Sequence, residues 1–349
     1  MARFRVAFSA DFWRPDGQSA YPDVDLSPLT GDPRIEIGIA HPVDRALGAE
    51  ALAGFDALVL FAPRVTRASL PADGRLGLVA RFGVGFDNVD VAGLADEGVA
   101  TCIAPQGVRR PVAVAILTLA LALTAKLMIK HQLTREGPAG FATRADHMGV
   151  GLEGRTLGSI GIGNIGAEMF RVFQPLGMTF MAHDPWADPA IARELGVRLV
   201  GLDDVFRQAD IVAVNCPLND GTRGLVNAAR LDLMKPTAYL INTARGPIVD
   251  QKALTEVVRA GRIAGAGLDV FDPEPTDPAD PLLALPNVIL APHALAWTDQ
   301  CFAMTGAADI AAVLAVMQGR QPEAIVDRRV LDHPRWRERL ARNRATFGG

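Results

Sequence analysis

The alternation of apolar and amphipathic segments after Arg155 restricts the fold of this chain more than any other feature. Six apolar runs of strand length follow one another, at Leu157–Ile162, Met178–Ala182, Ile211–Asn215, Tyr239–Asn242, Gly265–Val270 and Val288–Ala291. Amphipathic stretches of helical length separate them, for example Ile165–Phe173, Leu202–Gln208, Asn227–Met234 and Gln251–Ala260. Strands that are apolar throughout are typical of parallel sheets with helices on both faces. The pattern therefore predicts a doubly wound parallel α/β sheet.

The first hundred residues predict a second, smaller parallel sheet. We expect its strands at Phe4–Phe8, Ile35–Ile39, Ala57–Phe61 and Leu76–Ala80. A helix-like stretch at Asp44–Ala53 separates two of them, and residues 11–32 are rich in the Pro, Gly, Ser and Asp of loops. After Thr298 we expect a helix over Gln300–Met317 and then a polar, arginine-rich tail.

Length and composition indicate a globular protein of two domains. At 349 residues the chain is about twice the size of a typical domain. Its net charge of −4 gives no electrostatic basis for binding nucleic acid or an anionic membrane, so we expect neither as a partner. The most apolar stretch, Val112–Ala125, falls short of the roughly 20 residues of a membrane helix. The start also lacks the apolar core of a signal peptide, so we expect a cytoplasmic protein.

The cysteines and histidines do not follow a metal-binding pattern. Cys102, Cys216 and Cys301 are far apart in sequence and form no CxxC pair, and the chain has no HExxH motif. This spacing favours reduced thiols over a disulfide framework and predicts no metal site.

A glycine motif follows the first strand of the larger predicted sheet. Gly161, Gly163 and Gly166 fit G-x-G-x-x-G, between the run ending at Ile162 and the following amphipathic stretch. Glycines there allow a tight turn and a close approach of the backbone to a pyrophosphate, which then lies at a helix N-terminus. Asp184 ends the next strand, where a carboxylate would accept hydrogen bonds from the ribose hydroxyls of NAD and repel the 2′-phosphate of NADP. The alternative is a glycine-rich helix–strand contact with Asp184 as a turn residue.

Polar residues follow the last three strands of the same sheet. Arg245 follows one strand, Asp269 and Glu274 follow the next, and His293 follows the last. Parallel sheets bind ligands at the carboxyl ends of their strands, so these side chains are expected at one edge. An arginine can grip a substrate carboxylate with two hydrogen bonds, and an imidazole can donate a proton to a developing alkoxide. The glutamate can hold that imidazole in position, and the set is suited to the reduction of a ketone.

At these motifs the sequence closely resembles the D-isomer-specific 2-hydroxyacid dehydrogenase family. The resemblance runs from the strand near Ala57, through the segment Arg81–Asp90, to His293, and is strongest at Asn-Thr-Ala-Arg-Gly, Asp-Val-Phe-x-x-Glu-Pro and Pro-His. It implies two doubly wound domains, with a Rossmann NAD-binding domain (107–298) inserted into a flavodoxin-like substrate-binding domain (1–106 and 299–349). It also implies a homodimer, with the helix near Val112–Met128 at the interface.

The resemblance implies a role for each residue of the motifs. Arg245 would bind the substrate carboxylate and carbonyl, Glu274 would support the histidine, and His293 would be the acid and base. From the other domain, backbone N–H groups around Val84 and Gly85 would hold the carboxylate. The remaining residues would contact NAD: Asn164 and Ile165 at the pyrophosphate, Cys216 and Pro217 on the adenine side, and Thr243, Ala244 and Asp269 at the nicotinamide. The implied activity is hydride transfer between NAD(H) and a small 2-hydroxy or 2-keto acid, by an NAD-dependent D-2-hydroxyacid dehydrogenase.

Other functions remain open on the same scaffold. The family includes corepressors that use NAD binding to control dimerisation and partner recognition without significant turnover. Oxidation of formate is disfavoured by Glu274, where a neutral amide is expected. Some positions also depart from the family pattern, since Leu60 or Phe61 stands where several relatives place a substrate arginine, and Trp297 replaces a small residue.

Two arginines of the hinge segment raise a question about the substrate. Arg109 and Arg110 follow Pro105, in a segment that in the resembled family runs close to the cleft. An arginine is costly to bury unpaired, so one hypothesis is that these two bind a second polar or acidic group on the substrate. The alternative is that both point to solvent or pair with acids of a second subunit.

Overall fold

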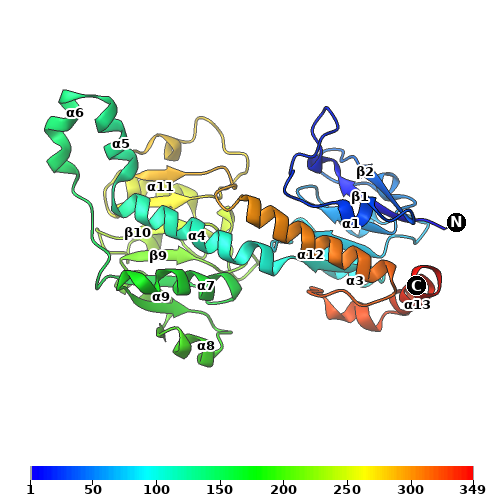
Figure 1. The fold of residues 1–349 in the computed structure, drawn as a ribbon. Helices are drawn as coiled ribbons and strands as arrows, with labels where there is room; N and C mark the ends of the chain where they lie inside the picture. Colours follow the sequence, from blue (N-terminus) through cyan, green and yellow to red (C-terminus); the bar gives the residue numbers. More distant parts are fainter. Residues whose placement is uncertain (1, 349) are drawn as a thin grey trace. The chain divides into compact units, whose positions relative to one another are not determined.

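In the computed structural model, which describes residues 2–348, the chain divides into two compact units. Unit 1 comprises Met1–Val108 and Thr298–Gly349, and unit 2 comprises Arg109–Trp297 (Figure 1). Unit 2 is thus inserted into unit 1 along the chain. The prediction of two doubly wound parallel-sheet α/β domains is confirmed, because every strand pair in both sheets is parallel.

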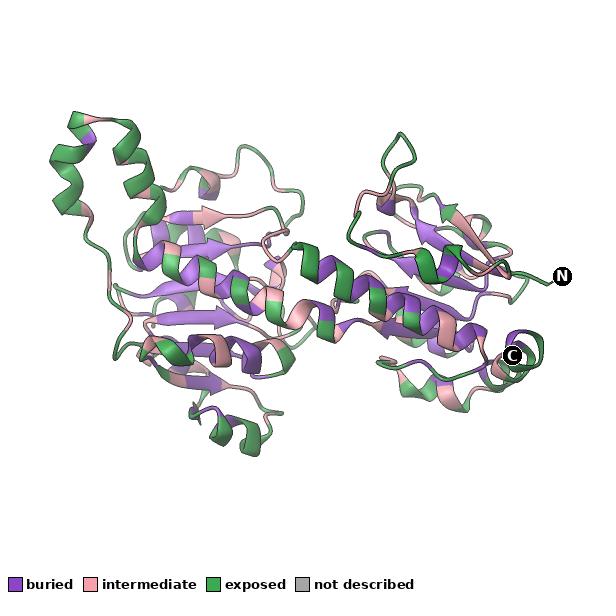
Figure 2. Cartoon of the chain, viewed as in Figure 1, coloured by how far each residue is buried: buried purple, intermediate pink, exposed green. Residues whose placement is uncertain are grey.

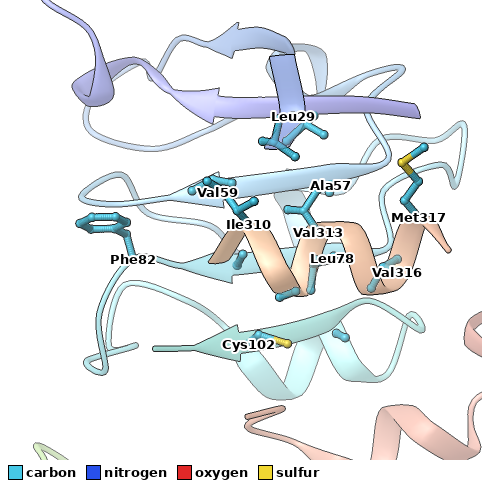
Figure 3. Packing of buried hydrophobic residues seen from close by; sticks show 14 of the residues in the cluster. Leu29, Ala57, Val59, Leu78, Phe82, Cys102, Ile310, Val313, Val316 and Met317 are labelled. Carbon is cyan, nitrogen blue, oxygen red and sulfur yellow. The ribbon is translucent and has the colours of Figure 1, made fainter. Parts of the chain in front are cut away.

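The sheet of unit 1 has five strands in the order β2-β1-β3-β4-β5, which is the flavodoxin-like order. Its strands are β1 (Phe4–Ser9), β2 (Ile35–Ala40), β3 (Ala57–Leu60), β4 (Leu78–Arg81) and β5 (Ala100–Ile103). Its helices are α1 (Ser27–Thr30), α2 (Ala49–Leu52), α3 (Val91–Ala95), α12 (Asp299–Met317) and α13 (Pro334–Phe347). Ile310 and Val313 of α12 pack on Val59 and Leu78 of the sheet, so the returning chain completes the core of unit 1 (Figure 3).

The sheet of unit 2 has seven strands in the order β12-β11-β10-β9-β6-β7-β8. This is the Rossmann order with one further strand at the edge. The strands are β6 (Thr156–Ile160), β7 (Thr179–His183), β8 (Val197–Leu199), β9 (Ile211–Val214), β10 (Tyr239–Asn242), β11 (Gly265–Leu268) and β12 (Val288–Leu290). The helices are α4 (Pro105–Thr124), which begins in unit 1, α5 (Leu127–Arg135), α6 (Pro138–Thr143), α7 (Asn164–Phe173), α8 (Pro189–Glu194), α9 (Leu202–Gln208), α10 (Ala228–Leu231) and α11 (Gln251–Arg259).

Side-chain caps explain where several of these helices begin. The Asp250 carboxylate accepts the backbone N–H of Ala253 at the start of α11, and the Thr298 hydroxyl accepts that of Cys301 at the start of α12. Such caps satisfy N–H groups that have no partner within the helix and stabilise it by about 1 kcal/mol. The observed starts therefore follow from single polar residues in the sequence.

Several predicted elements differ from those observed. The stretch Asp44–Ala53 is helical only over Ala49–Leu52, because Asp44 and Arg45 have positive φ angles of 47° and 64°. Of the stretch Asn227–Met234, only Ala228–Leu231 is α-helical. The strands β5 and β8 were not predicted.

The arginine-rich tail was predicted as polar chain, but it contains the 14-residue helix α13. Its buried stripe consists of Trp336, Arg339, Asn343 and Phe347, a spacing that places them on one helical face. Trp336 is 1% exposed in the core of unit 1. The buried Arg339 donates hydrogen bonds to the carbonyls of Gly98 and Gly74, so the helix is bound to two loops of that unit.

Two helices, α4 and α12, are long and apolar enough to cross a membrane by length and composition alone. In both, about half of the most apolar window is buried, 44% in α4 and 56% in α12. A Cβ atom at Gly267 of β11 would lie 3.1 Å from Leu119 and Leu123, so α4 packs closely on the unit 2 sheet. Both helices are therefore accounted for by core packing, whereas α5 and α6 form an arm of mainly exposed residues (Figure 2).

Candidate active site

The turn after β10 presents Arg245 at the carboxyl edge of the unit 2 sheet. Asn242, which is 1% exposed, accepts the backbone N–H of Ala244 at 3.0 Å and donates to the carbonyl of Arg245 at 2.9 Å. The Arg245 guanidinium in turn donates to the carbonyl of Ala244 at 2.7 Å. One buried amide thus fixes both ends of the turn, a function that sequence reasoning had not assigned to Asn242.

His293 and Glu274 come together in the loops that follow β12 and β11. The imidazole Nδ1 lies 2.9 Å from one carboxylate oxygen of Glu274. The other oxygen accepts the backbone N–H of Phe271 at 2.9 Å, so the carboxylate is held from both sides. With Nδ1 engaged by Glu274, Nε2 is the ring nitrogen left for chemistry on a substrate.

The environment of Glu274 favours its ionised form. Burial alone would raise the pKa of its carboxyl, but the hydrogen bond and charge of His293 and the amide of Phe271 lower it. The charge of Arg245 contributes in the same direction, and the net pKa lies below the ordinary value. Glu274 is therefore a carboxylate at neutral pH, suited to orient and stabilise a protonated imidazole.

The backbone of His293 is held in an unusual conformation. Its φ angle is +55°, in the left-handed region that side-chain-bearing residues rarely adopt, and its N–H donates to the carbonyl of Ala291 at 3.0 Å. The side chain is 44% exposed, which leaves it accessible. Strained backbone of this kind clusters at functional sites.

Asp269, at the end of β11, supports the histidine loop. Its carboxylate is 5% exposed and accepts the backbone N–H groups of Ala294 and Leu295 at 2.9 and 3.2 Å. Asp269 therefore fixes the residues directly after His293. This task was not predicted for it, and its contact with the nicotinamide stays a prediction.

The glycine motif has the geometry of a phosphate-binding turn. Gly161 has a φ of +100°, and a Cβ there would lie 2.9 Å from the backbone of Asn215. A Cβ at Gly166 would lie 2.5 Å from the carbonyl oxygen of Gly161. By contrast, Gly163 faces open space within 4 Å, directly before the N-terminus of α7, where Asn164 and Ile165 begin the helix. No neighbouring atom of the protein requires glycine at position 163. A pyrophosphate bound at that helix N-terminus would require it, because a side chain there would block its approach.

Asp184 lies directly after β7 and is connected to the glycine motif. Its carboxylate accepts the backbone N–H of Ile162 at 3.0 Å and that of Trp186 at 2.9 Å. A carboxylate has about four acceptor sites, so it keeps capacity for two ribose hydroxyls. The arrangement fits NAD better than NADP, since a 2′-phosphate would meet this charge.

The other predicted cofactor contacts surround the same strand ends. Cys216 and Pro217 follow β9, and burial raises the pKa of the Cys216 thiol to about 11, so it stays neutral. The Thr243 hydroxyl is buried and has no hydrogen-bond partner within residues 2–348. An unpaired buried hydroxyl is costly, and the predicted contact of Thr243 with the nicotinamide would satisfy it. Val84 and Gly85 lie in unit 1, in the loop after β4.

The structure does not support a substrate role for the hinge arginines. Both lie in the first turns of α4, and Arg110 and Arg109 pair with Glu168 of α7 at 2.7 and 3.8 Å. Glu168 is 5% exposed, so this buried carboxylate supplies the anion that the hypothesis sought on a substrate. The alternative that both point to solvent holds in part, because the Arg110 and Arg109 side chains are 61% and 38% exposed while they pair with Glu168 of the same unit. Pairing with a second subunit stays a prediction. A long-range ion pair of this kind has no signal in the sequence.

Within the described residues, no three His, Cys, Asp or Glu side chains form a group that could hold a metal ion. The site therefore consists of an arginine, a carboxylate–imidazole pair and a phosphate-binding turn, all in unit 2. Such a set can bind a dinucleotide, hold an anionic carbonyl compound and move a proton at its oxygen.

Comparison with known proteins agrees with this geometry. The sequence model described as D-isomer specific 2-hydroxyacid dehydrogenase, NAD binding domain, matches residues 117–294. A glyoxylate reductase from Aeropyrum pernix is 37% identical over 264 residues, which cover 74% of this chain and 78% of that protein. A D-3-phosphoglycerate dehydrogenase from Methanocaldococcus jannaschii is 34% identical over 84% of this chain and 55% of its own length.

A solved structure shows the same similarity at the level of the fold. D-lactate dehydrogenase from Aquifex aeolicus, complexed with NAD and lactic acid, superimposes with a TM-score of 0.76 at 26% identity. The match covers 90% of this chain and 96% of that one.

Proposed function

The chain belongs to the D-isomer specific 2-hydroxyacid dehydrogenase family, and we propose from this premise that His293 is its proton donor and acceptor. It is an NAD-dependent oxidoreductase that transfers a hydride between NAD(H) and a small 2-hydroxy or 2-keto acid. The observation that carries the proposal is the His293–Glu274 pair, with 2.9 Å between Nδ1 and the carboxylate. When bound, the nicotinamide supplies the hydride for C2 of the keto acid or takes it up in the reverse direction.

His293 moves the proton that accompanies this reduction. Its imidazolium donates from Nε2 to the keto oxygen as negative charge develops there, and in the reverse direction the neutral ring accepts the hydroxyl proton. Glu274 is the positioning residue, because it fixes the ring through Nδ1 and favours its charged form. Asp269 holds the loop in which the ring is carried.

Arg245 binds the substrate by its carboxylate and keto oxygen. A guanidinium offers donors in a planar fork that matches a carboxylate, and its charge also stabilises the developing alkoxide. Asn242 holds the turn that presents it. We assign the second grip on the carboxylate to the backbone N–H groups of Val84 and Gly85, and with it the binding of substrate to unit 1.

Unit 2 binds NAD through the residues of the glycine motif and of the neighbouring strand ends. Gly161, Gly163 and Gly166 allow the approach of the pyrophosphate, and Asp184 accepts the ribose hydroxyls. The contacts assigned to the remaining NAD-binding residues are part of the same proposal: Asn164, Ile165, Cys216, Pro217, Thr243, Ala244 and Asp269. A corepressor-like function is not favoured, because the relatives described above carry the names of enzymes.

We also propose that the chain is a cytoplasmic homodimer, and exposed apolar side chains of unit 2 support the dimer. Val114 and Leu121 lie two turns apart on α4 and are 44% and 42% exposed. Leu127, Met128 and Phe141 on the adjoining arm are 55%, 52% and 53% exposed. Exposed large apolar side chains gathered on neighbouring helices are typical of an interface. Sedimentation of the wild type and of Leu121→Asp tests it, with a dimer expected for the first and dissociation for the second.

Reduction of 2-keto acids with NADH tests the activity directly. Glyoxylate, pyruvate, hydroxypyruvate, oxaloacetate and phenylpyruvate are each added, and the loss of nicotinamide absorbance is followed. We expect turnover with at least one of them and a strong preference for NADH over NADPH. The absence of turnover with all of them, despite measurable NADH binding, would contradict the proposed function.

A further inference from the structure

Aromatic side chains follow three neighbouring strands of unit 1. Phe12 comes shortly after β1, Phe61 directly after β3, and Phe82 directly after β4. These strands are adjacent in the sheet order, and Figure 3 shows Phe82 beyond the end of its strand. Because the strands are parallel, the three rings lie at the same carboxyl edge, where sheets of this kind bind ligands.

The rings form one cluster with an accessible side. Phe12 and Phe82 are 5.1 Å apart between centroids, Phe61 and Phe82 are 5.5 Å apart, and Tyr21 contacts Phe61 at 5.6 Å. Phe302 of α12 contacts Phe82 at 5.3 Å. These five residues are called the aromatic cluster. Three of its members are at least 94% buried, namely Phe12, Phe82 and Phe302. Tyr21 and Phe61 are only partly buried, so the cluster has a fixed base and an open rim.

The cluster adjoins the segment assigned to the substrate carboxylate. Phe82 begins the loop that contains Val84 and Gly85, two and three residues further on. A group held at those backbone N–H groups would therefore have the cluster as its neighbour within unit 1. In a 2-keto acid, the atoms beyond the carboxylate and keto carbon are the substrate side chain.

The polar groups at this rim are the neutral Tyr21 hydroxyl, the Arg81 guanidinium and the Asp11 carboxylate, which together carry no net charge. Burial, together with the charge of Asp11, raises the pKa of the Tyr21 hydroxyl to about 12, so it stays neutral. The Arg81 guanidinium lies over the Phe61 ring at 5.9 Å and donates to the carbonyl of Phe82. The nearby acidic group, Asp11, accepts the backbone N–H of Ala62 at 2.8 Å and would repel a second carboxylate.

In unit 2 a large apolar side chain follows the proposed proton donor in the sequence. Trp297 is 47% exposed and lies four residues after His293. Its backbone N–H donates to the carbonyl of Ala294 at 3.0 Å. Both edges that carry the proposed substrate contacts thus present aromatic surface.

We propose that the aromatic cluster receives the substrate side chain, and that the preferred substrate is a 2-keto acid with an aromatic or large branched apolar group. This inference rests on the proposed function and specifies its substrate. Small acids such as glyoxylate would leave the rim in water, whereas a phenyl or isobutyl group would cover it. Each methylene-sized group that an apolar site accepts changes kcat/KM by roughly 10- to 200-fold.

Kinetics with NADH over a series of acids test the preference. The series is phenylpyruvate, 4-methyl-2-oxopentanoate, pyruvate, glyoxylate and oxaloacetate. We expect kcat/KM for the first two to exceed that for glyoxylate by roughly tenfold or more, with oxaloacetate the poorest substrate. Glyoxylate or oxaloacetate as the best substrate would overturn the inference and leave the proposed function intact. Failure of all five and of hydroxypyruvate would instead overturn the proposed function.

A matched pair of variants at the two ends of β3 tests the location. Phe61 follows the strand at its carboxyl end, and Phe55 precedes it at the amino end in a separate core cluster. Phe61→Leu should lower kcat/KM for phenylpyruvate relative to pyruvate by roughly tenfold, whereas Phe55→Leu should leave that ratio unchanged. Tyr21→Leu, at a partly exposed position, provides a second variant with the same expected loss. Equal ratios in the wild type, Phe61→Leu and Tyr21→Leu would overturn the assignment.

Discussion

The two sheets of this protein have the same construction and very different carboxyl edges. In unit 2 the strands β10, β11 and β12 are followed by Arg245, Glu274 and His293, which are charged or titratable and at least partly exposed. In unit 1 the strands β1, β3 and β4 are followed by Phe12, Phe61 and Phe82. Both sheets are parallel and apolar within, so the framework does not distinguish them. On the proposed assignments, the loops that follow the strands, and not the sheets themselves, determine which edge performs chemistry and which recognises the substrate side chain.

Removal of the proton donor is expected to have the largest effect. His293→Ala should lower kcat by roughly 10²- to 10⁴-fold, the usual contribution of a positioned acid and base, while NADH affinity stays close to wild type. Steady-state kinetics and a fluorescence titration with NADH measure the two quantities. His131→Ala is a control of the same residue type, on the exposed helix α5. If kcat is unchanged in His293→Ala, His293 does not transfer the proton. The proposed contrast between the carboxyl edges of the two sheets would then be wrong.

The next largest effect concerns the other end of the cofactor site. Asp184→Ala should narrow the preference for NADH over NADPH by roughly 10- to 100-fold, since one charge next to a phosphate is removed. Asp184 also accepts the N–H groups of Ile162 and Trp186, so its removal loosens the glycine motif itself. Asp184→Asn keeps an acceptor oxygen and separates the two effects. Kinetics with both cofactors decide the matter, and a wild-type enzyme that uses them equally would refute the assignment.

A smaller effect is expected from the positioning residue. Glu274→Gln should move the high-pH limb of keto-acid reduction to lower pH, because the imidazole loses the carboxylate that is hydrogen-bonded to Nδ1. The pKa of Glu274 lies below its ordinary value. In the wild type the ionised carboxylate therefore stabilises the folded site at every pH above that ordinary value. This stabilisation is lost only as the pH falls through the lowered pKa, when the carboxylate is protonated.

The pH profile of kcat/KM in the two proteins provides the test of Glu274. If Glu274→Gln lowers kcat/KM equally at every pH and leaves the high-pH limb in place, Glu274 has a structural role only. The amide can still accept the N–H of Phe271, so the turn itself should be preserved.

The sequence was sufficient where a function depends on residues that neighbour a strand end. The Arg245, Glu274 and His293 set and the glycine motif are local patterns, and the structure brings Glu274 and His293 into hydrogen-bond contact. The sequence was insufficient where the outcome depends on distant partners. The buried stripe of α13 was hidden by the arginines around it, and β8 has only three residues, two of them exposed. The positive φ angles at Asp44 and Arg45 likewise interrupt a helix that the apolar spacing predicts.

The ion pairs of Glu168 provide the smallest and most specific test of the contrast. Arg110 and Arg109 are 61% and 38% exposed, and both pair with a carboxylate that is 5% exposed. If the aromatic cluster recognises the substrate side chain, Arg109→Ala and Arg110→Ala should leave kcat/KM unchanged for every keto acid, oxaloacetate included.

Each single change should lower the free energy of unfolding by about 1 kcal/mol or less, since exposed ion-pair partners are well screened by solvent. The double change should cost more than the sum, because it leaves only Arg171, at 3.5 Å, beside a buried charge. Glu168→Gln removes that charge and should recover part of the loss in the double variant. Thermal unfolding and kinetics measured on the same samples distinguish the two roles. A selective loss of oxaloacetate turnover in either single variant would return the arginines to the substrate and contradict the apolar assignment.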